Sequence, residues 1–219
     1  DNKSQQPQIL VALMVTKEGF PIAFEIFSGN TFEGHTIIPT IKNFIGRNKV
    51  KEFTVVADAA MISSENITQL NQNEINYIVG ARLGNLSIKL LGTIDEQIVR
   101  QDGKSIRIKT ELGYLICSYS SVRYRKDLYE MNKQIEKAKQ VVEVPSKSRK
   151  LKFTKTNDQK LELNEELIEK TKKLLGIKGY YTSLEENIAD NKTIIERYHE
   201  LYQIEQAFRV SKGDLRTRP

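Results

Sequence analysis

The chain is poor in the residues that build disulfides and soft-metal sites, with one cysteine, two histidines and no tryptophan among 219 residues. Cys117 alone excludes an internal disulfide framework and a cysteine-rich zinc site. His35 and His199 are too few for a histidine-built metal centre. No apolar run approaches the ~18 residues of a membrane span, so no membrane partner is expected. If the protein holds a metal ion, carboxylates must bind it.

What is present is the balance of an ordinary globular protein, with 39% hydrophobic and 28% charged residues. The formal net charge of +6 suits an anionic partner such as nucleic acid but does not require one. Most of this excess lies between residues 130 and 160. A solvated helix and loop would explain that charge run, and so would an arm that contacts phosphates.

The first eighty residues alternate between the two kinds of secondary structure. Apolar runs bounded by turn residues predict strands, and apolar residues at helical spacing predict helices. The order of the elements predicts an α/β sheet of mixed direction. The expected strands are Ile9–Val15, Phe20–Phe27, Phe53–Ala57 and Ile75–Ala81, with helices at Thr36–Ile45 and Ser63–Asn73.

The alternation of strands and helices changes after residue 83. This change predicts an inserted segment of mixed α and β structure at 84–179. The core would then consist of two parts, 1–83 and 180–219. Within the insertion we expect strands at Ile94–Val99, Ser105–Lys109 and Tyr114–Ser118 and helices at Val122–Val142 and Leu161–Leu175. The last part should hold a strand at Tyr180–Leu184 and a long helix over residues 191–211.

On that last helix, one face carries residues at steps of four and three. Its members are Ile194, Tyr198, Leu201, Glu205, Phe208 and Lys212. Glu205 thus falls in an apolar stripe, where a carboxylate is costly unless it is paired, hydrogen-bonded or bound to a metal. A salt bridge to Arg209 or Lys212 is the plain alternative.

Asp58 follows the strand Phe53–Ala57, and ligand sites in open α/β sheets form at the carboxyl ends of strands. A turn or helix cap would also explain this aspartate. Together with Glu205 it favours a site for Mg²⁺, which prefers oxygen ligands. Two such ions can activate a water and stabilise the leaving oxygen in phosphoryl transfer. Tyr198 and Lys212 share the face of Glu205 and could contact a phosphate.

These residues resemble DDE-type transposases of bacterial insertion sequences that carry a Tyr-x2-Arg-x3-Glu-x6-Lys signature. Here the stretch has Tyr198, Glu205 and Lys212 in place, with Leu201 instead of the arginine. Similar stretches occur along nearly the whole chain, at residues 15–22, 29–31, 55–61, 77–82, 207–209 and 214–219.

The resemblance implies a ribonuclease-H-like core interrupted by the insertion, with Asp58 and Glu205 as second and third carboxylates of a triad holding two Mg²⁺ or Mn²⁺ ions. Tyr198, Lys212 and Arg209 would contact DNA. Such enzymes act as homodimers on terminal inverted repeats, cut by water attack and join the freed 3′-hydroxyl to target DNA. The expected location is the cytoplasm of a bacterium or archaeon.

The sequence departs from that family at its start. The first catalytic aspartate should end a strand upstream of Asp1, and this strand should lie at the centre of the sheet. We therefore interpret the chain as an internal fragment that lacks the central strand, is inactive alone and is poorly soluble. Two other functions stay open: a DNA-binding remnant of a decayed transposase that has lost its chemistry, and an unrelated metal-dependent nuclease.

Overall fold

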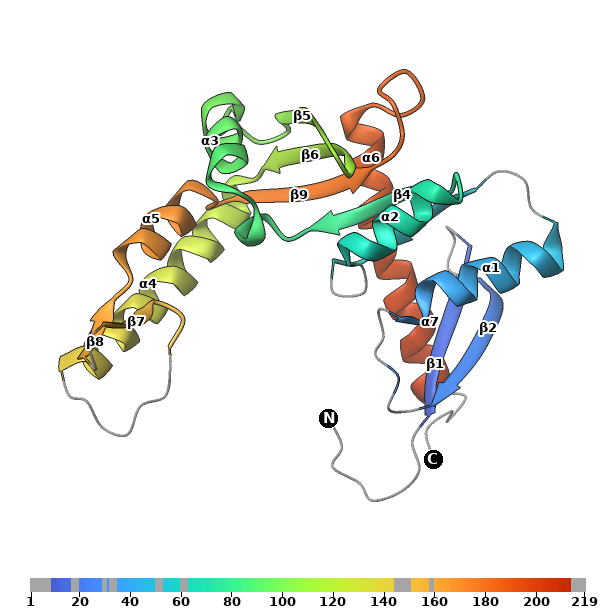
Figure 1. Cartoon of the computed structure of the whole chain (residues 1–219), viewed down its shortest axis with the longest axis horizontal. Coiled ribbons are helices and arrows are strands. Elements are labelled where there is room, and N and C mark those ends of the chain that lie inside the picture. The colour runs from blue at the N-terminus through green and yellow to red at the C-terminus, as the bar shows by residue number, and fades with distance from the viewer. Residues whose placement is uncertain are drawn as a thin grey trace. The chain divides into compact units, whose positions relative to one another are not determined.

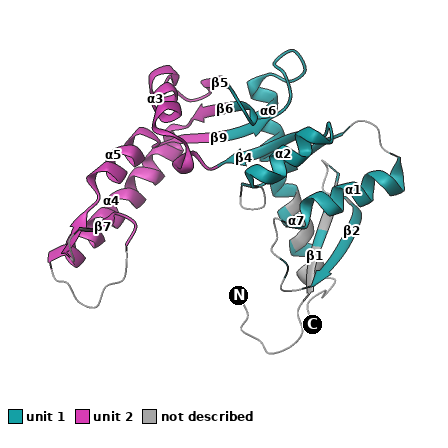
Figure 2. Cartoon of the chain, in the orientation of Figure 1, with its two compact units in different colours: residues 1–81, 108–115, 180–219 teal, residues 82–107, 116–179 magenta. Residues whose placement is uncertain are grey.

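A computed structural model describes residues 9–16, 20–28, 31, 35–49, 53–59, 63–143, 151–157 and 160–213. The chain divides into two compact units, coloured separately in Figure 2. The first consists of residues 1–81, 108–115 and 180–219, and the second of residues 82–107 and 116–179. Each unit is therefore assembled from segments far apart in the sequence.

The first unit contains two strands, a helix, a strand, a helix and a strand in its amino-terminal part, which is the order expected from the sequence. Two helices form its carboxyl-terminal part. These elements are β1 (Ile9–Val15), β2 (Pro21–Ser28), α1 (Ile37–Asn48), β3 (Thr54–Ala57), α2 (Ser64–Gln72), β4 (Asn76–Ala81), α6 (Asn191–His199) and α7 (Leu201–Gly213).

The second unit is mainly helical and includes a small hairpin. Its elements are a 3-10 turn (Leu83–Asn85), α3 (Ile88–Gln97), α4 (Ser121–Glu143), β7 (Thr154–Asn157), β8 (Lys160–Leu163) and α5 (Glu165–Lys173). Three more strands have residues in both units: β5 (Ser105–Thr110), β6 (Gly113–Tyr119) and β9 (Ile177–Thr182).

The main sheet has five strands in the order β3-β4-β9-β6-β5. β3 and β4 are parallel, with Val56 opposite Ile78, whereas Figure 1 shows β9 running in the opposite direction to β4. The expectation of a mixed α/β sheet is thus confirmed, and the architecture is compatible with a ribonuclease-H-like core.

β1 and β2 form an antiparallel sheet of their own, with Leu13 opposite Phe24. Alternate residues of a strand point to opposite faces, and four apolar side chains on one face of this segment are exposed: Phe20, Ile22, Phe24 and Ile26. Among the described residues, the hairpin pairs with no strand of the five-stranded sheet.

Tyr77 on β4 connects several segments in the core of the first unit. Its side chain is fully buried and donates a hydrogen bond to the carbonyl of Leu112, while its own carbonyl accepts one from the Thr182 hydroxyl at 2.7 Å. Gly113 has φ +96°, and a Cβ there would lie 2.5 Å from the Thr182 carbonyl oxygen. Only glycine fits this close approach.

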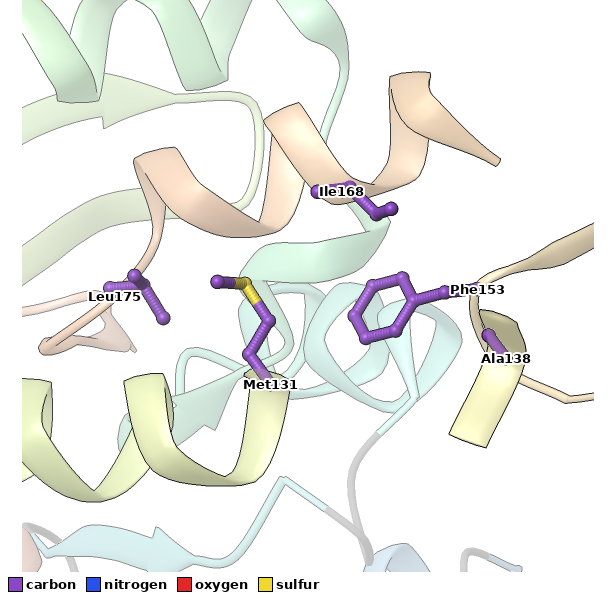
Figure 3. Close-up of a cluster of buried hydrophobic side chains, with 5 residues drawn as sticks. All are labelled: Met131, Ala138, Phe153, Ile168 and Leu175. Atoms are coloured by element: carbon purple, nitrogen blue, oxygen red, sulfur yellow. The ribbon is translucent and has the colours of Figure 1, made fainter. Parts of the chain in front are cut away.

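The core of the second unit is built around α4. Figure 3 shows Met131 and Ala138 on that helix, with Phe153, Ile168 and Leu175 lying around them. Although α4 has 23 residues, no helix in the part of the chain that the structure describes is both long and apolar enough to cross a bilayer.

Cys117 lies on β6 and is fully buried. Burial disfavours the thiolate and raises the pKa of the Cys117 thiol to about 12. The cysteine is therefore an unreactive core residue.

Three predicted elements differ from the structure. Ile94–Val99 is not a strand, because Ser87 caps a helix that places Leu91 and Ile94 in the core. The helix predicted from Leu161 starts later, because Asn164 caps it and the residues before it form β8. The single helix predicted over 191–211 is two helices, α6 and α7.

Asp102 caps the amino terminus of α4. Its carboxylate accepts hydrogen bonds from the backbone N–H and the hydroxyl of Ser121, each at 2.6 Å. These bonds favour the charged form and lower the pKa of Asp102.

We expect Asp102→Asn to lower the urea midpoint of unfolding. A carboxylate with a lowered pKa stabilises the folded state above the usual carboxyl pKa near 4, and this stabilisation is lost as the pH falls through the lowered value. The difference between wild type and variant should therefore be constant from pH 7 to about pH 5 and shrink below pH 4. A difference that stays constant at lower pH would contradict this role.

Candidate active site at the carboxyl end of β3

Asp58 directly follows β3, at the carboxyl end of the strand as the sequence predicts. β3 ends in the buried Ala57, and the Asp58 side chain is exposed. Its Oδ1 accepts a hydrogen bond from the backbone N–H of Ala59 at 2.6 Å. The carboxylate thus stands at the strand end, held by its neighbour and open to solvent.

The second hydrogen bond to this carboxylate comes from a residue 140 positions away along the chain. The Tyr198 hydroxyl donates to Asp58 Oδ1 at 2.7 Å. Tyr198 is only 6% exposed, because α6 packs against β3 and β4. The Tyr180 ring meets it edge to face, with 4.9 Å between the ring centres. Tyr198 is therefore held in place on several sides.

Gly80 on β4 makes room for this contact. A Cβ at Gly80 would lie 2.6 Å from the Tyr198 hydroxyl, 2.9 Å from the Ala59 Cβ and 3.0 Å from the Ala59 nitrogen. Any side chain at this position would compete with the hydroxyl that binds Asp58. Glycine inside a strand often marks such a close approach.

The protonation of Tyr198 follows from its surroundings. Burial, and then the hydrogen bond and charge of Asp58, raise the pKa of the Tyr198 hydroxyl. Both effects disfavour a phenolate next to a carboxylate. Tyr198 consequently keeps its proton at neutral pH and acts as a permanent donor to Asp58.

Glu205 lies on α7 and is exposed. The prediction that it lies in the same buried stripe as Ile194 and Tyr198 is wrong, although those two residues are buried on α6. The helix is interrupted at Glu200, whose carbonyl accepts from Gln203 three residues on rather than four. This tighter turn changes the phase of the residues that follow.

The other predicted DNA contacts lie on the same helix. Arg209 is exposed on α7. Lys212 falls within α7, but its side chain lies outside the described residues. The Tyr198 hydroxyl donates its hydrogen bond to Asp58. The predicted contact of Tyr198 with DNA stays a prediction.

Of the predicted site residues, the structure brings Asp58 and Tyr198 into contact. Both hydrogen bonds fall on Oδ1 of Asp58, and the described part of the chain donates none to Oδ2. The same part contains no group of three or more His, Cys, Asp and Glu side chains that could hold a metal ion. Sequence reasoning missed Gly80 and Tyr180, although a glycine within the strand Asn76–Ala81 was a usable signal for the first.

Comparison with protein families matches residues 1–218 to the transposase DDE domain. The comparisons with curated proteins and with solved structures gave no match. The matched region includes the β3 end with Asp58, the second unit and both carboxyl-terminal helices. The chain belongs to the family of DDE transposase domains.

Proposed function

We propose that this chain carries part of a Mg²⁺-dependent active site that cleaves DNA at the ends of an insertion sequence and transfers the freed strand to target DNA. One observation carries the proposal: an exposed carboxylate, Asp58, at the end of a strand of a DDE transposase domain, fixed by the buried Tyr198. The finer assignments below rest on that geometry and on the family.

The donor atoms fit a hard divalent cation. Asp58 keeps Oδ2 clear of hydrogen bonds from the described residues, and Glu205 offers a second exposed carboxylate. Mg²⁺ and Mn²⁺ suit such oxygen ligands. We assign Asp58 and Glu205 as ligands, and two bound ions would supply an activated water and charge stabilisation for in-line displacement at phosphorus.

The protein's own contribution is to orient Asp58. Tyr198 and the Ala59 N–H both hold Oδ1, which fixes the plane of the carboxylate and leaves Oδ2 for the metal. Hydrogen bonds to a ligating carboxylate are the usual way in which a protein sets the direction of a ligand. Because Tyr198 keeps its proton, this orientation should not change over the neutral pH range.

We further infer that the complete site uses a third carboxylate, on a strand between β1 and β3. In the described residues β1 pairs with β2 alone, and β3 is the last strand of its sheet. α6 contacts β3 and α7 contacts β1, so the same pair of helices would cover such a strand. On this basis the 219-residue chain alone should not cut DNA.

The family also suggests the setting of the reaction. We propose that the full-length protein acts as a homodimer in the cytoplasm and binds terminal inverted repeats as double-stranded DNA. Lys212 and Arg209 on α7 would contact the cleaved end.

Glu205→Gln tests the proposal in the full-length protein that contains this chain. We expect Mg²⁺-dependent strand cleavage to fall about 10²-fold or more, because the amide removes an anionic ligand. DNA binding should be unchanged. The matched control is Glu196→Gln, an exposed acid on α6 that pairs with Lys192, which should leave cleavage unaffected.

Two results would favour other functions. Steeply salt-dependent DNA binding with no Mg²⁺-dependent nicking by any form of the protein would indicate a DNA-binding remnant. Cleavage without preference for inverted repeats would indicate a nuclease unrelated to transposition. Equal cleavage by Glu205→Gln and wild type would remove Glu205 from the site.

A further inference from the structure

One face of α4 carries exposed side chains that neither the core nor the proposed active site uses. Val122, Lys126, Tyr129, Lys133 and Lys137 follow each other at steps of four, three, four and four, so they share one side of the helix. Tyr129 is 65% exposed and Val122 66% exposed. We call these five residues the α4 outer stripe.

The stripe lies on the side of α4 away from the core. Met131 and Ala138 are buried against Phe153 on the core side. At about 100° per residue, Tyr129 and Lys133 lie roughly opposite those two positions. Tyr129 therefore makes no contribution to the core, and an exposed tyrosine between lysines needs another explanation.

The stripe lysines hold no short ion pairs. Two of the four acids of α4, Asp127 and Glu136, pair with other cations, Arg123 at 3.4 Å and Lys139 at 3.1 Å, while exposed Glu130 lies one turn from Lys126 and Lys133 without an ion pair to either. None of the three stripe lysines forms an ion pair with a described residue. Lys133 Nζ instead lies 5.9 Å from the centre of the Tyr129 ring.

We propose that the α4 outer stripe binds the sugar-phosphate backbone of duplex DNA, outside the active site. This rests on the proposed function, which makes DNA the substrate. From Lys126 to Lys137 the helix advances ~16 Å, which matches about five base pairs along one strand. The lysines supply charge, and the Tyr129 hydroxyl donates to a phosphate oxygen, a contact that positions DNA without reading its sequence.

The test measures binding of the full-length protein that contains this chain to a random-sequence duplex at several salt concentrations. Each phosphate contact contributes about 0.9 to the slope of log affinity against log salt. Neutralising the three stripe lysines should therefore lower the slope by about 2.7 and weaken binding equally for all sequences. The test variant is Lys126→Gln, Lys133→Gln and Lys137→Gln.

A control variant with the same loss of charge separates the stripe from net charge. It replaces three exposed lysines elsewhere in the second unit by glutamine: Lys89, Lys104 and Lys172. Its slope should stay within about 0.5 of wild type, because lost net charge alone has a weaker effect than lost contacts. Tyr129→Ala should weaken binding several-fold more than Tyr129→Phe, since the ring also packs against the sugar.

The outcomes separate this inference from the proposed function. Equal slopes for the stripe variant and the control variant would overturn the proposal that the α4 outer stripe binds DNA. The proposed transposase function would not be affected. A lowered slope for the stripe variant alone, with no cleavage by the full-length protein, would support the stripe and overturn the proposed chemistry. Failure of the wild-type full-length protein to bind any duplex in low salt would overturn both. All substituted side chains are exposed, so circular dichroism should show unchanged folding.

Discussion

Asp58→Asn should lower Mg²⁺-dependent cleavage by the full-length protein about 10³-fold or more, which corresponds to about 4 kcal/mol of transition-state stabilisation. Asparagine has the size and shape of aspartate but replaces an anionic oxygen by an amide, which Mg²⁺ binds weakly. Tyr198 and the Ala59 N–H both bind Oδ1, and the asparagine carbonyl can accept the same two bonds. The free energy of unfolding should therefore change by less than about 1 kcal/mol.

Tyr198→Phe provides the comparison, because it keeps the charge of Asp58 and removes only the hydrogen bond that orients it. Losing such an outer partner of a metal ligand usually costs 10-fold to 100-fold in activity or metal affinity. We expect a smaller loss of cleavage than for Asp58→Asn, with part of it regained at higher Mn²⁺ or Mg²⁺ concentration. A single-turnover cleavage assay over a metal titration measures both. If Asp58→Asn cleaves DNA at the wild-type rate, Asp58 is not part of the active site.

The position of Asp58 could be predicted because it depends on local pattern alone. A short apolar run predicts β3. The residue that follows a strand lies at the strand's carboxyl end, where ligand sites form in open α/β sheets. The same holds for the helix predicted over Ser63–Asn73, where the Ser63 hydroxyl accepts from the Asn66 N–H at 3.1 Å and caps α2. Strand ends and helix caps can be predicted because they depend on residues that are close together in the sequence.

The partner of Asp58 could not be predicted in the same way. Tyr198 reaches it from 140 residues away, and the hydrophobic spacing of α6 says only that Tyr198 faces inward, not which group its hydroxyl meets. The direction of Glu205 was missed for a related reason. Helical spacing was extended across Glu200, where one tighter turn alters the phase.

The second unit shows a different limit, that of turn signals. Ile94–Val99 is predicted as a strand because it and Ser105–Lys109 flank the turn residues Gln101-Asp102-Gly103. Ser87 caps a helix there instead, and Leu91, Ile94 and Ile98 are buried at helical spacing. In this segment the cap and the helical spacing were stronger signals than the turn that follows.

Gly80→Ala should destabilise the first unit by about 2–3 kcal/mol, as over-packing of a tight site usually does. The added methyl would lie 2.6 Å from the Tyr198 hydroxyl and 2.9 Å from the Ala59 Cβ. The Ala59 nitrogen, at 3.0 Å, belongs to the backbone and moves little. Tyr198 must therefore give way, which breaks its hydrogen bond to Asp58 and lowers cleavage as well as stability. Urea unfolding and the cleavage assay measure the two effects.

Gly92→Ala is the matched control, because a Cβ at Gly92 would meet nothing within 4 Å. Inside helix α3 this change should stabilise the protein by about 0.5–1 kcal/mol. A double-mutant cycle then tests whether the destabilisation by Gly80→Ala comes from the Tyr198 hydroxyl. In a Tyr198→Phe background the nearest clashing atom is gone, so the destabilisation by Gly80→Ala should fall by about 1 kcal/mol or more. An undiminished cost would mean that the Ala59 contacts alone require glycine, and that Gly80 does not serve the bond between Tyr198 and Asp58.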